Sequence, residues 1–185
     1  MGDTLVFLGI DISTAKFVNP DKLDKSIYIR NRHGEVWGRV DDILIKRQDM
    51  KYDFQKKVII TTPTLFDNSY RLLDSNWVVE KYEGLTDIEV RKQVSTYPLI
   101  QNSKLGLAIL VDKMDMPQKQ VSVCAAYIDL TTNIVIKILR AEGGIGGGFG
   151  YTAYWKTGFE NAYHGVISQN DKYLKELRRF LGIKK

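Results

Sequence analysis

The chain has 185 residues, a formal net charge of +5, and 44% hydrophobic against 26% charged residues. This length and composition suit one folded domain and exclude an intrinsically disordered chain. The longest apolar runs, such as Leu107–Val111, fall far short of the roughly 20 residues that cross a bilayer. We therefore expect one soluble domain over residues 1–185, with no transmembrane helix.

Runs of apolar and β-branched residues predict the elements of the first half of the chain. Leu5–Ile12 and Lys57–Thr62 predict strands, since nearly continuous apolar runs of this length suit strands in a covered sheet. Apolar residues at three- and four-residue spacings predict a helix within Gly34–Met50. A short helix is predicted over Phe66–Asp74 and a short strand over Trp77–Tyr82. Strands and helices therefore alternate in this half.

The second half begins with a helix and continues as a meander. Thr86 and Glu89 form a capping box, which predicts a helix that ends before Pro98. Three strands are predicted to follow it, over Leu105–Val111, Val121–Leu130 and Ile134–Arg140. Asp129–Asn133 supplies turn chemistry for a hairpin between the last two strands.

Two helices are predicted after the glycine-rich segment Gly143–Gly150. The first has one apolar face, formed by Trp155, Phe159, Ala162, Tyr163 and Val166. Asn170 or Asp171 is expected to cap the second. The whole order predicts an α/β (α+β) fold, with one mixed β-sheet, packed helices and a C-terminal β-meander followed by two helices. No linker or repeat divides the chain, so residues 1–185 are expected to form a single domain.

The glycine-rich segment allows two interpretations. Glycines between a strand and a helix can hold a phosphate, but no lysine follows them as a P-loop requires. Alternatively, the glycines let the strand end in a bulge and let the next helix pack closely on the sheet. A glycine loop bordered by tyrosines would also suit a sugar, peptide or protein partner. The candidate binding residues are Gly146, Gly147, Gly148, Tyr151, Tyr154 and His164.

The histidines and the cysteine do not indicate a metal or catalytic site. His33 and His164 lie in distant segments without the companions of a metal site. Cys124 is the only cysteine, so it forms no internal disulfide, and its apolar neighbours suit an inert buried thiol. No cofactor is predicted.

Asp11 carries the main enzymatic alternative. The segment Gly9–Thr14 resembles the first motif of the ribonuclease H and sugar-kinase folds, in which a strand aspartate holds a divalent metal or orients phosphate. Asp112 is the candidate second metal ligand. In the competing interpretation, Asp11 ends a core strand and caps the turn that follows.

Three stretches together resemble a known family. Phe7–Lys16, Asp42–Asp53 and Gly147–Trp155, in this order and spacing, are similar to small, uncharacterised secreted proteins of Bacteroidetes. Ile128–Asn133 also resembles the "strand, Asp-x-x-Thr-Gly, strand" turn of penicillin-binding-protein activator lipoproteins and the curli secretion lipoprotein, with Asn133 in place of glycine. The resemblance implies a mixed α/β fold and an exported protein (periplasmic, outer-membrane-associated or extracellular), whose leader is absent from this chain. It implies no activity.

Two functional hypotheses follow. The leading one is a non-catalytic exported or envelope domain, not an enzyme, that binds or helps to assemble a protein or glycan partner. The alternative is a metal-dependent phosphotransfer or nuclease domain that uses Asp11. No specific nucleic-acid binding is expected, because the positive charges are dispersed and no recognition motif is present.

Overall fold

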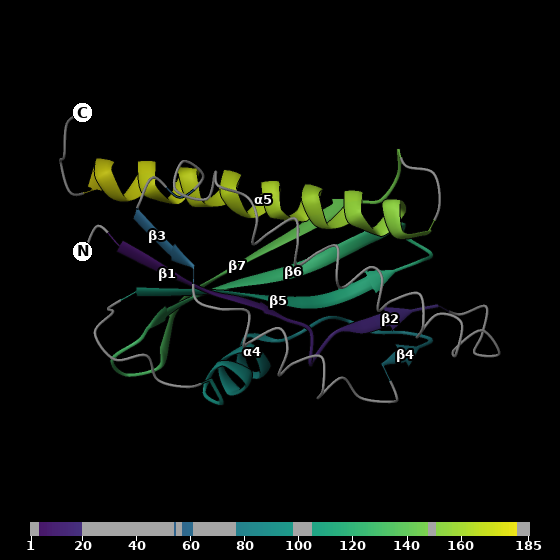
Figure 1. The fold of residues 1–185 in the computed structure, drawn as a ribbon, viewed down its shortest axis with the longest axis horizontal. Helices are drawn as coiled ribbons and strands as arrows, with labels where there is room; N and C mark the ends of the chain where they lie inside the picture. The colour runs from purple at the N-terminus through teal and green to yellow at the C-terminus, as the bar shows by residue number, and fades with distance from the viewer. Residues whose placement is uncertain are drawn as a thin grey trace.

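The computed structural model describes residues 4–19, 54, 57–60, 77–97, 105–147 and 151–180. A seven-stranded sheet runs through them, with helix α5 (Tyr151–Phe180) across one face and α4 (Asp87–Val94) on the other (Figure 1). The predicted α+β class with one mixed sheet is confirmed. The helices predicted within Gly34–Met50 and over Phe66–Asp74 lie outside the described residues.

Strand β5 is the centre of the sheet. The strands are β1 (Thr4–Asp11), β2 (Lys16–Val18), β3 (Lys57–Ile60), β4 (Val78–Val79), β5 (Leu105–Asp115), β6 (Gln120–Asp129) and β7 (Ile134–Gly144). β1 and β2 pair in parallel with successive lengths of β5, and β3 and β4 pair in parallel with β1 and β2. β6 and β7 continue from β5 as antiparallel strands. One half of the sheet is therefore parallel and the other is a meander.

Most predicted strands are confirmed with shifted ends. β5 and β7 each extend four residues beyond their predicted ends, to Asp115 and to Gly144, so β7 includes the first two residues of the glycine-rich segment. The predicted Trp77–Tyr82 strand is reduced to Val78–Val79. β2 was not predicted, because a three-residue strand is too short to show a period.

The sheet buries an apolar layer on each face. β5 is buried along nearly its whole length, as its apolar run predicts. Under α5, the core includes Phe7, Ile10, Val111, Val123, Ala141, Trp155, Phe159 and Tyr163. Under α4, it includes Val6, Leu8, Val90, Val94, Leu110, Cys124 and Ile128. The predicted apolar face of the helix after the glycine-rich segment is thus confirmed.

The prediction of two C-terminal helices is wrong, because α5 is one helix of 30 residues. Asn170 does not cap a new helix. Its side chain is buried against the sheet, where its Oδ1 accepts a hydrogen bond from the Tyr127 hydroxyl at 2.9 Å. With that oxygen engaged by Tyr127, the helix continues past residue 170. Neither α4 nor α5 has the apolar stretch that a membrane crossing needs.

Close packing of α5 on β7 depends on Gly143. A Cβ atom at this position would lie 2.1 Å from the Gly158 carbonyl oxygen and 2.3 Å from the Ala162 backbone nitrogen. Gly143 belongs to β7 rather than to a loop after it. The interpretation that the glycines permit close helix-on-sheet packing is therefore confirmed at this position.

Side chains from both helices donate to carbonyl oxygens of β7, which pairs only with β6 among the described strands. Arg91 Nη1 of α4 donates to Val135 O at 2.7 Å. Asn161 Nδ2 of α5 donates to Gly144 O at 2.8 Å, and Gln169 donates to Arg140 O. The outer strand thus has hydrogen-bond partners along its length.

The β6–β7 turn holds the C-terminal end of α4. Asp129 Oδ1 accepts from the Thr131 N–H at 2.8 Å, which confirms the predicted turn chemistry. Asn133 adopts the left-handed conformation (φ 57°), and its Nδ2 lies 3.3 Å from both Val94 O and Tyr97 O. Asparagine here therefore does what glycine cannot, because its amide caps the helix.

Asn133→Ala is expected to lower the free energy of unfolding by about 2 kcal/mol, since it loses both the cap and a residue tolerant of positive φ. Asn133→Gly should lose only the cap, at a cost of about 1 kcal/mol. Urea denaturation of the two variants measures the difference. Equal stability of Asn133→Gly and the wild-type protein would contradict the capping role.

Candidate functional site

The structure separates the residues proposed around the glycine loop. Gly146 (φ 149°) and Gly147 (φ 77°) have no atom within 4 Å of an added Cβ, so open space surrounds them. Tyr154 is half-buried in the first turn of α5. His164 is exposed and lies ten residues further along α5, about 15 Å away at the rise of a helix. Gly148 and the side chain of Tyr151 lie outside the described residues.

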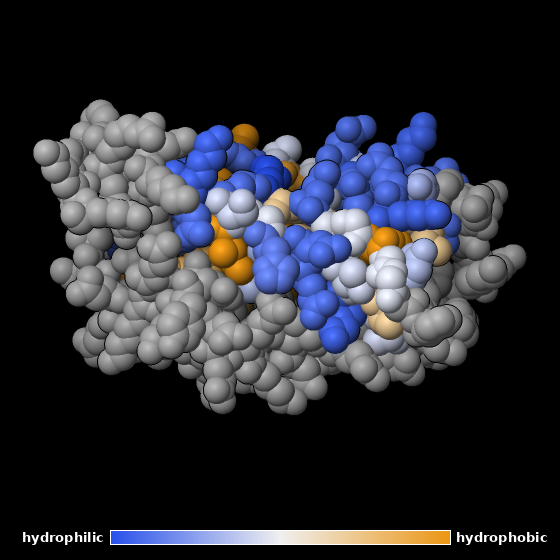
Figure 2. Space-filling model, turned by 90° about the horizontal axis from the view of Figure 1, so that it is seen from above, coloured by the Kyte–Doolittle hydropathy of each residue, from blue (hydrophilic) through white to orange (hydrophobic). Residues whose placement is uncertain are grey.

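The face that includes the outer side of α5 is mostly hydrophilic over the described residues. Figure 2, which views the molecule from above Figure 1, shows apolar colour there only in small separate spots. Scattered apolar side chains of this kind are normal on a protein surface. This view therefore offers no broad apolar docking surface.

Asp11 is committed to structural hydrogen bonds. It is fully buried, and its Oδ1 accepts from the Ser13 N–H at 2.8 Å and the Ser13 hydroxyl at 2.7 Å. Its Oδ2 accepts from Gln93 Nε2 at 2.8 Å and from the Tyr97 hydroxyl at 2.6 Å. The interpretation that Asp11 ends a core strand and caps the next turn is confirmed. The carboxylate also fixes the C-terminal end of α4.

Asp112, the second candidate metal ligand, lies at the other end of α4. Its Oδ1 accepts from the Leu85 N–H at 2.8 Å, just before the helix begins. Asp11 instead contacts Gln93 and Tyr97, at and beyond its last turn. Strand register pairs Asp11 of β1 with Leu110 of β5, two residues before Asp112, while the hydrogen bonds of the two carboxyl groups reach opposite ends of the eight-residue helix α4. Among the described residues, no group of three or more His, Cys, Asp or Glu side chains can hold a metal ion.

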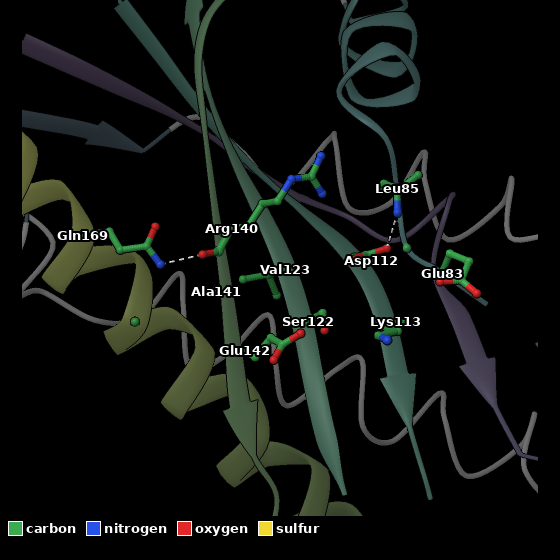
Figure 3. Close-up of a pocket in the computed structure, with 12 residues that line it drawn as sticks. Glu83, Leu85, Asp112, Lys113, Ser122, Val123, Arg140, Ala141, Glu142 and Gln169 are labelled. Carbon is green, nitrogen blue, oxygen red and sulfur yellow. Dashed lines mark hydrogen bonds between the residues drawn. The ribbon is translucent and has the colours of Figure 1, made fainter. Parts of the chain in front are cut away.

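Asp112 lies in a cavity of about 470 Å³ that extends to the sheet edge at β7. We call this cavity the edge groove. Its polar lining is formed by Glu83, Asp112, Lys113, Ser122, Arg140, Glu142 and Gln169. Figure 3 shows the strands β5, β6 and β7 as its floor and the segment through Glu83 and Leu85 as one wall.

Strand register brings three polar side chains of the edge groove into one row. Lys113 of β5 is paired with Ser122 of β6, and Ser122 is paired with Glu142 of β7. Side chains of directly paired residues are close neighbours, with Cβ atoms about 5 Å apart. In Figure 3 the Glu142 carboxylate lies beside Ser122. Ser122 is 4% exposed, and its buried hydroxyl has no hydrogen-bond partner among the described residues.

Both cations of the edge groove already have carboxylate partners outside it. Arg140 Nη2 lies 2.6 Å from Asp87 Oδ1, and its Nη1 lies 3.2 Å from the Cys124 sulfur. Lys113 Nζ lies 3.5 Å from Asp115 Oδ2. Cys124 is buried as predicted, and burial raises the pKa of its thiol to about 12.

The carboxyl group of Asp112 forms no ion pair with any described residue. Burial raises its pKa above the ordinary value, and neighbouring Glu142 adds to this effect. The Leu85 N–H, Arg140 and Lys113 oppose the shift and are outweighed. Desolvation, then the charge of Asp112, also raises the pKa of the half-buried Tyr82 hydroxyl. The edge groove therefore has an excess of negative charge.

Asp112→Asn is expected to raise the midpoint of thermal unfolding at pH 7 by about 3 °C. Because the folded-state pKa of Asp112 is raised, the folded protein favours the protonated carboxyl, and wild-type stability falls as pH rises from the ordinary value of 3.8 through the folded value. The variant cannot ionise here, so its advantage should disappear below about pH 4. Thermal unfolding at several pH values measures this; a variant that is less stable at pH 7 would contradict it.

Sequence reasoning found Asp112 but missed Ser122, Arg140 and Glu142. Ser122 interrupts an apolar strand, and Arg140 and Glu142 are two residues apart on β7, which places them on one face. These two features of the sequence could have indicated a polar site on this face of the sheet. Ser122, Arg140 and Glu142 lie in one groove with Asp112 because of the bulge between Val111 and Lys113 and the register of three strands. The sequence specifies neither of these features.

No protein-family model matches the chain, and no curated protein matches it significantly. Among solved structures, a lipoprotein from Neisseria meningitidis is similar at 10% identity, with a TM-score of 0.35, over 81% of this chain and 86% of the other. A hypothetical protein from Chlamydia trachomatis is similar at 11% identity, with a TM-score of 0.31, over 99% and 100% of the two chains. At these TM-scores the likeness has no bearing on function.

Proposed function

We propose that the chain is a non-catalytic domain of the cell envelope that binds a protein or glycan partner in the edge groove. The Ser122 hydroxyl carries this proposal, because Ser122 lines the groove and its almost fully buried hydroxyl has no hydrogen-bond partner in the part of the chain that the structure describes. A buried polar group without a hydrogen bond is costly, and a bound ligand would supply the missing bond.

The rigid surroundings of the groove support a binding role. Asp112 and Asp11 hold the two ends of α4 against the sheet, and Arg140 joins β7 to Asp87 on the helix. A preformed site loses less conformational entropy when it binds than a flexible one does. An envelope location rests on the resemblance of Phe7–Lys16 and Gly147–Trp155 to secreted proteins.

A second contact is proposed at the glycine loop. Gly146 and Gly147 are surrounded by open space, and Tyr154 keeps part of its ring exposed. Together with Gly148 and Tyr151 they would offer backbone amides and aromatic rings to the same partner. His164 would contribute only to a partner that extends along α5.

Site-specific photo-crosslinking in the source cells tests the proposal. A photoreactive residue is placed at Glu83 on the groove rim, at Tyr154, or at exposed Lys92 of α4 as a control. We expect a defined crosslinked species from Glu83 that is absent from Lys92. Crosslinking from Tyr154 to the same species would place the glycine loop in the interface. No species from Glu83, or the same species from all three positions, would contradict the proposal.

Cell fractionation tests the location independently. We expect the protein in the envelope or extracellular fraction. Recovery only with cytosolic markers would contradict export.

A further inference from the structure

We propose that the edge groove binds an organic ammonium group, held between Glu142, Asp112 and the Ser122 hydroxyl. This inference rests on the proposed function and names the chemistry by which the groove recognises its partner. The ammonium group could come from a lysine side chain of a partner protein or from a free small amine.

The balance of charge favours a cationic ligand. Three carboxylates line the edge groove, those of Glu83, Asp112 and Glu142, and none forms an ion pair with a described residue. The two lining cations, Lys113 and Arg140, are paired with Asp115 and Asp87. An anionic ligand would therefore have to displace existing ion pairs, whereas a cation would meet free carboxylates.

The Ser122 hydroxyl is the independent sign of a ligand. It is paired across the strands with Glu142 and lines the groove without any hydrogen bond. An ammonium group has three donors and no acceptor. One N–H can therefore reach Ser122 Oγ while the other two reach the carboxylates, which satisfies the buried hydroxyl and neutralises a buried charge at the same time.

An organic cation fits better than a metal ion. No group of His, Cys, Asp and Glu side chains in the described residues has the arrangement of a metal site. The volume of about 470 Å³ also falls among cavities that hold small organic ligands. Glu83 and Glu142 are exposed at the rim, so an ammonium on an alkyl stem can enter from solvent and place its charge beside Ser122.

The buried carboxyl of Asp112 fits the same role. Burial disfavours its charged form, and the nearby cations Arg140 and Lys113 offset this effect only in part. Residues that cost stability in the free protein are common where binding requires them. A bound ammonium group would offset this cost.

Titration with defined amines tests the inference on the whole chain. The probes are cadaverine, the capped peptide acetyl-Gly-Lys-Gly-amide, and the same peptide with acetylated lysine, each followed by NMR of the ¹⁵N-labelled protein. We expect saturable shifts at residues 122 and 142 with cadaverine or the lysine peptide, and none with acetyl-lysine. Glu142→Gln should weaken binding about tenfold, and Ser122→Ala about fivefold.

Glu160→Gln is the matched control, because it removes the same charge from α5, where Glu160 pairs with Lys156 outside the groove. It should leave the affinity unchanged. Equal affinity for cadaverine and the peptide identifies a small-amine site, and tenfold tighter peptide binding identifies a partner's lysine. No saturable binding of either, or equal weakening by Glu142→Gln and Glu160→Gln, would overturn the inference.

The two proposals can fail separately. Crosslinking from Glu83 without any amine binding would leave a partner in the groove and overturn only the ammonium chemistry. Amine binding without a crosslinked partner would keep the cation site and overturn the partner-binding function.

Discussion

Gly143→Ala is expected to destabilise the protein by about 3 kcal/mol or more. The new Cβ would lie 2.1 Å from Gly158 O and 2.3 Å from Ala162 N. Both are backbone atoms of α5, so no side-chain rotation relieves the overlap and the helix must move away from β7. That movement would open the layer that contains Trp155 and Phe159. Urea denaturation followed by circular dichroism measures the loss.

Gly144→Ala is the matched control. Gly144 is the next residue of β7, and nothing lies within 4 Å of its added Cβ. The free energy of unfolding of this variant should stay within about 0.5 kcal/mol of the wild-type value. A comparable loss in both variants would mean that glycine itself, and not the close approach of α5, is what this strand requires.

Asp11→Ala is expected to lower the free energy of unfolding by about 4 kcal/mol. The substitution removes the acceptor for four hydrogen bonds and leaves the Tyr97 hydroxyl and the Gln93 amide without it. It also frees the C-terminal end of α4 from β1. Thermal and urea unfolding measure the loss, and faster hydrogen exchange should appear at residues 90–97.

Asp129→Ala measures the part of this effect that comes from the local turn alone. Asp129 makes the same local turn, accepting from the N–H and the hydroxyl of Thr131 at 2.8 and 2.6 Å, but it is half-buried, whereas Asp11 is fully buried. Asp129→Ala should lower the free energy of unfolding clearly less than Asp11→Ala does. An Asp11→Ala protein as stable as wild type would contradict the anchoring role.

Magnesium separates this role from the nuclease alternative. If the role of Asp11 is structural, its replacement should lower the stability of the protein by the same amount with and without magnesium. A magnesium-dependent thermal shift that is present in wild type and lost in Asp11→Asn would instead support metal-dependent chemistry at this strand.

Local patterns predicted the elements of this fold well, because their causes are local. The capping box of Thr86 and Glu89 and the turn at Asp129 are both formed by side chains within three residues of the groups they bind. The continuous apolar run of β5 likewise indicated a strand covered on both faces.

The failures came from contacts between distant residues. Asn170 looked like a helix cap, but its oxygen is engaged by Tyr127 across 43 residues, so α5 continues. The edge groove depends on the same kind of information, since Ser122 gains its neighbours through strand register. The tyrosine and glycine pattern indicated one end of α5, whereas the edge groove and its buried Ser122 hydroxyl lie at the sheet edge.

The three side-chain donors along β7 also limit how another polypeptide can approach. Arg91, Asn161 and Gln169 occupy the carbonyl oxygens of Val135, Gly144 and Arg140. An incoming strand could extend the sheet here only by displacing all three, so addition of a foreign strand, including fibril growth from this side, is disfavoured. A polypeptide that binds at the β7 edge is therefore recognised by its side chains rather than by its peptide backbone.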